Sequence, residues 1–262
     1  MWRGSAVVAL LTLIAAPAAG QCTTNAAEII DVLYVRLLER HPDAQSQALS
    51  QELASGRVPV KSAVAAITKS QEHLTRLWLP VVAAAFLQVR NAMPESDRVL
   101  DAARTLARGA RTLDEVTIAL AVEEAAGLTP DTAVIALYTR LLGRDPTPED
   151  VERQAQTVTR DGIEPLARGI VGSAEFRERF GRNAVPVQGT RAYEPSLRIL
   201  YRELLNRESD PEGLAQYAQI AAQSGFGVVI DQILASAEYQ ELFGPQGIPG
   251  ASAGKTRYCG VP

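Results

Sequence analysis

Two short motifs near the C-terminus have the residue types of known catalytic and phosphate-binding loops. Residues 250–254 read G-A-S-A-G and match the G-x-S-x-G loop that presents a nucleophilic serine. That chemistry needs an acid and then a histidine further along the chain, and residues 255–262 contain neither. The overlapping G-K-T at 254–256 ends like a phosphate-binding loop, but Pro249 stands where its first glycine is required. Neither motif predicts an active site, and we interpret residues 251–262 as a flexible tail.

The other candidates for chemistry are two histidines and the acids of two loops. Neither His41 nor His73 has a partner at metal-ligand spacing, and His73 occupies the place of Phe176 and Tyr239 in related segments, which favours packing. The loop acids lack the ligand spacing and central glycine of a calcium loop and are typical of helix capping. The sequence therefore predicts no catalytic residue, no metal ligand and no cofactor, and we do not expect an enzyme. The loop acids are Asp145, Glu149, Asp150, Glu208, Asp210 and Glu212.

A nine-residue phrase recurs three times along the chain, each time followed by an S-x-E motif. The phrase occupies residues 32–40, 136–144 and 199–207, and S-x-E occupies residues 70–72, 173–175 and 236–238. A degenerate fourth copy is centred on Phe86, with Ala92 and Val122 in the places of the arginine and the serine. Recurrence of this kind predicts four stacked units that bury their apolar faces against one another. The recurring residues to which we assign structural roles are Tyr34, Arg40, Glu72, Tyr138, Arg144, Ser173, Glu175, Tyr201, Arg207, Ser236 and Glu238.

The elements of each unit read as helices. Apolar residues over 131–144 follow the i, i+3, i+4, i+7 spacing of one buried face. Gly143 then stands where a helix ends in the left-handed conformation, which asparagine also tolerates in the related segments. Glu39 takes this place in the first unit, so there we expect a different helix end. Helix starts are expected at Thr147-Pro148 and Asp210-Pro211, and at the serines of the S-x-E motifs.

The recurring arginine and the S-x-E glutamate have opposite charges and occur together in three units. We predict that Arg144 pairs with Glu175 and Arg207 with Glu238, buried or half-buried, so that each pair locks the first helix of its unit to the fourth. An arginine that binds an external anion is the alternative role.

The N-terminus has the features of a secretory signal over residues 1–20. Arg3 is followed by an apolar run over Ala6–Ala16, and small residues offer cleavage sites near Gly20 or Ala18. The run is shorter than the roughly twenty residues of a membrane span. Cys22 suggests a lipoprotein, but Gln21 precedes it where a small residue is expected, which favours simple export.

The chain has two cysteines, Cys22 and Cys259, near the opposite ends of the exported protein. In an oxidising compartment two cysteines most often pair, which predicts a disulfide between the two ends. Free thiols or a bond to another chain are the alternatives.

The order tyrosine, two leucines, glycine or asparagine, arginine, then S-x-E followed by an aromatic residue resembles a bacterial domain-of-unknown-function family related to phycobilisome linker domains. Residues 180–186 read F-G-R-N-A-V-P and are similar to the F-G-x-x-x-V-P that ends a linker unit. The similarity covers 131–250 well and 27–73 in part. It implies an all-helical, non-catalytic fold that connects other proteins.

Taken together, the sequence predicts an all-α protein of four linker-like repeats in two pairs, 21–130 and 131–250, after the signal peptide. The expected location is the periplasm, the cell surface or the medium, and the expected partners are other envelope or extracellular proteins. A net charge of −4 disfavours nucleic acid, and we expect no membrane span. The leading interpretation is a protein-interaction or scaffold module; a secreted small-molecule or glycan-binding protein and, last, a hydrolase are the alternatives.

Overall fold

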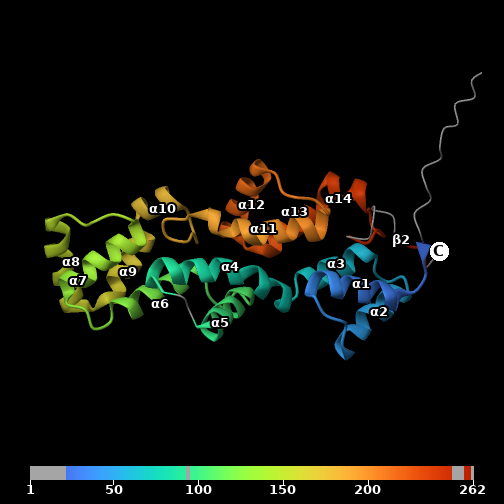
Figure 1. Cartoon of the computed structure of the whole chain (residues 1–262), viewed down its shortest axis with the longest axis horizontal. Helices are drawn as coiled ribbons and strands as arrows, with labels where there is room; N and C mark the ends of the chain where they lie inside the picture. The colour runs from blue at the N-terminus through green and yellow to red at the C-terminus, as the bar shows by residue number, and fades with distance from the viewer. Residues whose placement is uncertain (1–21, 93–94, 250–256, 261–262) are drawn as a thin grey trace, which may run out of the picture.

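The computed structural model describes residues 22–92, 95–249 and 257–260, and this part of the chain is all-helical (Figure 1). The predicted all-α class is confirmed. The predicted signal peptide and residues 251–256 of the predicted tail lie outside the described residues. The α-helices are α1 Ala26–Leu38, α2 Gln47–Ala54, α3 Val60–Thr68, α4 Gln71–Arg90, α5 Ser96–Ala107, α6 Leu113–Ala125, α7 Pro130–Leu137, α8 Pro148–Asp161, α9 Ile163–Gly172, α10 Ala174–Phe180, α11 Glu194–Leu200, α12 Pro211–Ser224, α13 Phe226–Ala235 and α14 Ala237–Leu242.

Short helical turns and two strands complete the fold. The turns η1 Ala44–Ser46 and η3 Thr190–Tyr193 are 3₁₀, whereas η2 Tyr138–Leu142 and η4 Tyr201–Leu205 are π-helical. The recurring phrase in the third and fourth units therefore ends in a wider turn than the α-helix expected there. The strands β1 Cys22–Thr23 and β2 Arg257–Tyr258 pair in parallel. Residues 257–260 thus correct the prediction of a flexible tail, because β2 holds them against the first strand.

Four units follow one another along the chain, and the third and fourth are the most regular. The third unit consists of α7 with η2, α8, α9 and α10, and the fourth of α11 with η4, α12, α13 and α14. The predicted starts are confirmed: Thr147 and Asp210 cap α8 and α12, and Ser173 and Ser236 cap α10 and α14, each side chain accepting a backbone N–H three residues on.

The first two units share a helix. The first unit consists of α1, α2, α3 and the start of α4, and the second of the end of α4, α5 and α6. Ser70 caps α4, which then runs for 20 residues without a break and supplies the first helix of the next unit. In the second unit α6 continues through Val122 to Ala125 because no serine is present to end one helix and begin another.

Left-handed residues end the first helix of every unit. Gly143, Asn91 and Asn206 have φ of 66°, 49° and 57°, as predicted. Glu39 has φ of 57° as well, so the expectation of a different end in the first unit is wrong. Its carboxylate is bound by Arg76, a contact that helps to hold a glutamate in a conformation disfavoured for residues with a side chain.

The packing does not follow the predicted division at residue 130. Helices α11 and α13 of the fourth unit lie along α4 and α3 (Figure 1), and α9 of the third unit lies against α6 of the second. Trp78 of α4 makes edge contacts with Tyr193 and Phe226, whose ring centres lie 5.8 and 5.0 Å away. Ser196 donates to the main-chain oxygen of Leu77 over 2.6 Å. The chain runs outward through three units, and its fourth returns onto the first.

Candidate functional site

Three units bring the same three side chains together, a set that we call the arginine triad. In the third unit, two nitrogens of Arg144 donate to the two carboxylate oxygens of Glu175 over 2.6 and 2.7 Å. The guanidinium carbon of Arg144 lies 5.1 Å from the centre of the Tyr138 ring. Its third nitrogen donates to the main-chain oxygen of Asp145 over 3.1 Å. One guanidinium thus joins the end of the first helix of the unit to the start of the fourth, which is the contact predicted from the sequence.

The first unit repeats this geometry. Arg40 donates to both carboxylate oxygens of Glu72 over 2.7 Å and lies 5.2 Å from the centre of the Tyr34 ring. The side chains of Arg40 and Glu72 remain 36% and 48% exposed, so the pair is half-buried at most. A bidentate pair of this exposure is a modest stabiliser, because water competes for both charges.

The fourth unit has the third arginine triad. Arg207 makes the same bidentate pair with Glu238, and its guanidinium carbon lies 4.9 Å from the centre of the Tyr201 ring. The hydrogen bonds from Arg207 hold the pKa of the Glu238 carboxyl below its ordinary value. Burial raises the pKa of Tyr201 to about 12, so this phenol keeps its proton at neutral pH. The triad has no group that is ready to accept a proton near neutrality.

The serines of the S-x-E motifs help to position the glutamates that follow them. The hydroxyl of Ser173 accepts the N–H of Phe176 and donates to the main-chain oxygen of Ile170, which ends α9 and begins α10 at a fixed angle. Glu175 then stands in the first turn of α10, where the helix dipole also favours an acid. The serine and the glutamate therefore work together in building the unit.

The second unit contains a triad in which the arginine comes from a different helix, and the sequence did not predict it. Arg98 of α5 pairs with Glu123 of α6 and lies 5.6 Å from the centre of the Phe86 ring. The arginine thus comes from the second helix, since Ala92 occupies its usual place. A signal for the glutamate was present: Glu123 follows Phe86 by the same 37 residues that separate Glu175 from Tyr138.

We predict that the triad contributes fully to stability above about pH 4 and progressively less as the pH falls further. The hydrogen bonds from Arg144 lower the pKa of Glu175 in the folded state. The contribution is therefore complete above the pKa of about 4.3 that a glutamate has in the unfolded chain, and it is lost as pH falls through the lower, folded value. Arg144→Gln should cost about 1 kcal/mol of unfolding free energy at pH 7, because the pair is half-exposed.

Urea unfolding of wild type and Arg144→Gln at pH 7, 5 and 3 measures this difference. Arg160→Gln is the matched control, since Arg160 lies on the surface of α8 and, within the described part of the chain, pairs with its neighbour Asp161 alone. A cost of Arg144→Gln that is the same at pH 3 as at pH 7 contradicts the assignment to the ion pair.

A second polar cluster lies between the first and fourth units. His73 is fully buried, and its Nε2 lies 2.8 Å from a carboxylate oxygen of Glu203. The other oxygen of Glu203 accepts from Arg76 over 3.2 Å, and Arg76 also binds Glu39. Arg36 donates to the main-chain oxygen of Glu203 over 3.4 Å. His73 is packed as predicted, but it is also a polar contact between units, which its place in the repeat did not indicate.

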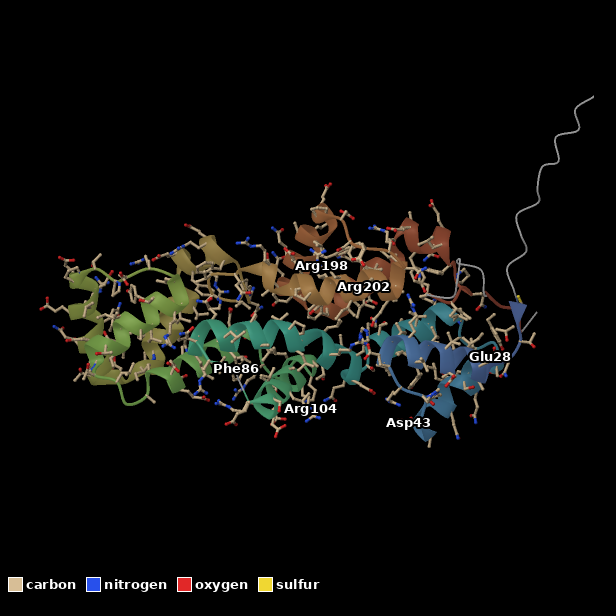
Figure 2. The ribbon with its side chains drawn as sticks, in the orientation of Figure 1. Glu28, Asp43, Phe86, Arg104, Arg198 and Arg202 are labelled. Atoms are coloured by element: carbon tan, nitrogen blue, oxygen red, sulfur yellow. The ribbon has the colours of Figure 1, made fainter. Side chains whose placement is uncertain are left out.

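The surface is hollowed at the same place in the first two units. The second-unit pocket, about 280 Å³, lies between α5 and α6 over Phe86, and the first-unit pocket, about 380 Å³, lies over Tyr34. Figure 2 shows Phe86 on α4, with Arg104 on the neighbouring α5, whereas Arg198 and Arg202 belong to α11 and η4 of the fourth unit. Each pocket is bordered by the arginine and glutamate of its unit, so the triads of these two units lie at the rims.

The predicted cysteines are brought toward one another by the strands. Cys22 is paired with Arg257 in the strand register, and the N–H of Cys259 donates to the main-chain oxygen of Thr23 over 3.0 Å. The side chain of Cys22 lies outside the described residues, so the disulfide stays a prediction.

No group of three or more histidine, cysteine, aspartate or glutamate side chains is placed to hold a metal ion within residues 22–92, 95–249 and 257–260. None of the helices in this part of the chain is both long and apolar enough to cross a bilayer.

No family model, curated protein or solved structure matches this chain.

Proposed function

We propose that the chain is an exported, non-catalytic protein-interaction or scaffold module of the periplasm or cell surface, with other envelope or extracellular proteins as its partners. The observation that carries the proposal is that the recurring polar residues bind one another inside the protein. The arginine and the glutamate of each triad bind one another within their own unit. Glu203 of the fourth unit binds Arg76, so it joins two units. The residues that recur therefore build an elongated helical array, and the outer faces, which differ from unit to unit, are left for contact with other molecules (Figure 1).

The outer face of α1 is the part of this array that best suits a protein partner. Val32 and Val35 are one helical turn apart and are 40% and 43% exposed. Leu87 takes the place of Val35 in the second unit and is 41% exposed. The same position of the first two units therefore offers an exposed large apolar side chain to a partner.

Kinship with the phycobilisome linker domains is part of the proposal. It is supported by the repeat itself and by the F-G-x-x-x-V-P segment, in which Gly181 ends α10 with φ of 97° and Val185 forms a bridge with Gly189. Linkers of that kind connect other proteins, which agrees with a scaffold.

Affinity capture from envelope extracts of the source organism tests the proposal. The wild-type protein should recover a specific partner, and the variant Val32→Glu with Val35→Glu should lose it. Val228→Glu is the control, because Val228 is equally exposed, at 39%, but lies on α13. Recovery of no specific partner by wild type contradicts the proposal. Sequencing of the N-terminus of the protein from the same extract should begin near residue 21 if the chain is exported.

We predict a single disulfide between Cys22 and Cys259 in the exported protein. The pairing of β1 with β2 supports it, because the two strands bring the chain ends together. Cys259→Ser should lower the free energy of unfolding by about 2 kcal/mol, at the low end of the usual range because each strand has only two residues. Peptide mapping without reductant should find one cross-linked peptide. Adding Cys22→Ser to Cys259→Ser should cost nothing further, and an additional loss contradicts the pairing.

A further inference from the structure

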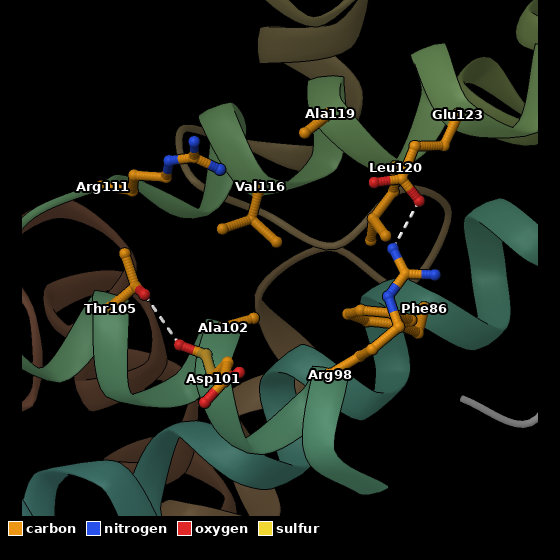
Figure 3. A pocket seen from close by; sticks show the side chains of 10 residues that line it. All are labelled: Phe86, Arg98, Asp101, Ala102, Thr105, Arg111, Val116, Ala119, Leu120 and Glu123. Atoms are coloured by element: carbon orange, nitrogen blue, oxygen red, sulfur yellow. Dashed lines mark hydrogen bonds and ion pairs between the residues drawn. The ribbon is translucent and has the colours of Figure 1, made fainter. Parts of the chain in front are cut away.

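The second-unit pocket has an apolar floor and a charged rim (Figure 3). The floor is formed by the ring of Phe86 from α4, by Ala102 from α5, and by Val116 and Leu120 from α6. Phe86, Val116 and Leu120 are each less than a tenth exposed, so they form a rigid, packed surface. At about 280 Å³ the pocket is at the small end of ligand sites and suits one compact group, such as a phenyl ring or a branched alkyl chain.

The charges around this floor are paired with one exception. Arg98 is bound to Glu123 on one side of the pocket, and Asp101 pairs with Arg104. Arg111 lies on the opposite side, as Figure 3 shows, and makes no hydrogen bond or ion pair with a described residue. Its guanidinium therefore has donors available for a ligand at the edge of an apolar surface.

Helix stability does not account for the position of Arg111. It directly precedes Thr112, the N-cap of α6, where the helix dipole disfavours a cation. Its charge acts on Glu115, and that carboxylate is already held by the N–H of Thr112 over 2.8 Å.

The first-unit pocket provides a comparison inside the same molecule. It lies at the equivalent place, over Tyr34, but the arginine at its rim, Arg40, is bound to Glu72 of the triad. Among its charged side chains, Glu52 is an acid that makes no hydrogen bond or ion pair with the described residues. The two pockets share a position in the repeat, but the side chain at the rim that the described residues leave unpaired is a cation, Arg111, in one and an anion, Glu52, in the other.

We propose that the second-unit pocket binds a carboxylate that carries one compact apolar group, with the apolar group on Phe86 and Leu120 and the carboxylate on Arg111. Two sources have this chemistry: a free organic acid, or the C-terminal carboxylate of a peptide that ends in a large apolar residue. The inference goes beyond the proposed scaffold function, because capture of a partner by the α1 face does not require the pocket.

Phenylacetate is the probe, and its neutral amide is the matched control ligand. Titration of the ¹⁵N-labelled protein with phenylacetate should shift the backbone amides of Ala102, Val116 and Leu120, and it should leave those of Leu49 and Ile67 at the first-unit pocket in place. Arg111→Gln should weaken the affinity about ten-fold or more, since it removes a charge-assisted contact. Phenylacetamide should bind as weakly to wild type as phenylacetate binds to Arg111→Gln.

Two further variants separate the site from general effects of charge and folding. Arg108→Gln removes another exposed arginine that lines neither pocket, and it should leave binding unchanged. Ala102→Leu fills the floor, and it should abolish binding while the rest of the spectrum keeps its dispersion. Equal binding of acid and amide, or an equal loss in Arg108→Gln and Arg111→Gln, overturns the proposal.

A pair of peptides distinguishes the two sources. A tetrapeptide that ends in a free phenylalanine carboxylate and its C-terminally amidated form are titrated in the same way. Tighter binding of the free-acid peptide than of phenylacetate assigns the site to protein C-termini. Weaker binding of the peptide assigns the site to small organic acids.

Discussion

Trp78→Ala is expected to lower the free energy of unfolding by about 4 kcal/mol, the largest effect of any single change considered for this protein. Trp78 is only 8% exposed and touches the rings of Tyr193 and Phe226. Truncation removes a large apolar side chain from between the two halves of the chain and leaves a cavity that rigid helices fill poorly. Denaturant unfolding followed by far-UV circular dichroism measures the change.

The same experiment tests whether the halves of the chain fold together. Because Trp78 belongs to α4 and its partners belong to η3 and to α13 of the fourth unit, its loss should shift one cooperative transition to lower denaturant. Two separate transitions in the wild type, with Trp78→Ala affecting one of them, would falsify the returning arrangement and restore two sequential pairs. Val228→Ala, at an exposed position of α13, is the control and should change little.

Glu203→Ala is expected to cost about 3 kcal/mol. The carboxylate of Glu203 is the shared partner of His73 and Arg76, and its own side chain is 8% exposed. Its removal leaves the Nε2 of the fully buried His73 without its partner and takes one carboxylate acceptor from Arg76, which costs more than the ion pair itself contributes.

A matched pair of variants isolates this cluster. Glu208→Ala removes a glutamate from the next loop whose side chain is 72% exposed, and it should be neutral within about 0.5 kcal/mol. Combining Glu203→Ala with His73→Phe should recover part of the loss, because phenylalanine fills the site without needing an acceptor. If the double variant is less stable than the sum of the single changes predicts, the buried histidine is not the source of the cost.

Local features of the fold were predictable because each is specified by neighbouring residues. Ser173 and Ser236 begin helices through a hydroxyl three positions from the N–H that it accepts, so spacing alone identifies them. The bidentate contact of Arg144 with Glu175 was predictable for a related reason, since the repeat shows that both residues vary together among the units. The fold class followed from the helical period of the apolar residues.

Features that depend on distant residues were not predictable. Glu39 was expected to end its helix differently, but Arg76, 37 residues away, binds its carboxylate in the left-handed conformation. The contact of His73 with Glu203 joins residues 130 positions apart, and no recurring pattern in the sequence indicates that they pair. The same holds for the return of the fourth unit onto the first. The role of Arg98 was not predictable because it lies on α5, whereas the usual arginine position of the unit is occupied by Ala92.

The contact between the first and last units sets the order in which the chain can fold. Arg36, His73 and Lys69 find their partners only in residues that are synthesised after position 200. The first unit to appear must therefore wait for the last before its face is covered, and such distant contacts slow folding. Under the proposed export from the N-terminus, the partners of these side chains are the last to cross, which disfavours folding of the first unit before the whole chain has passed.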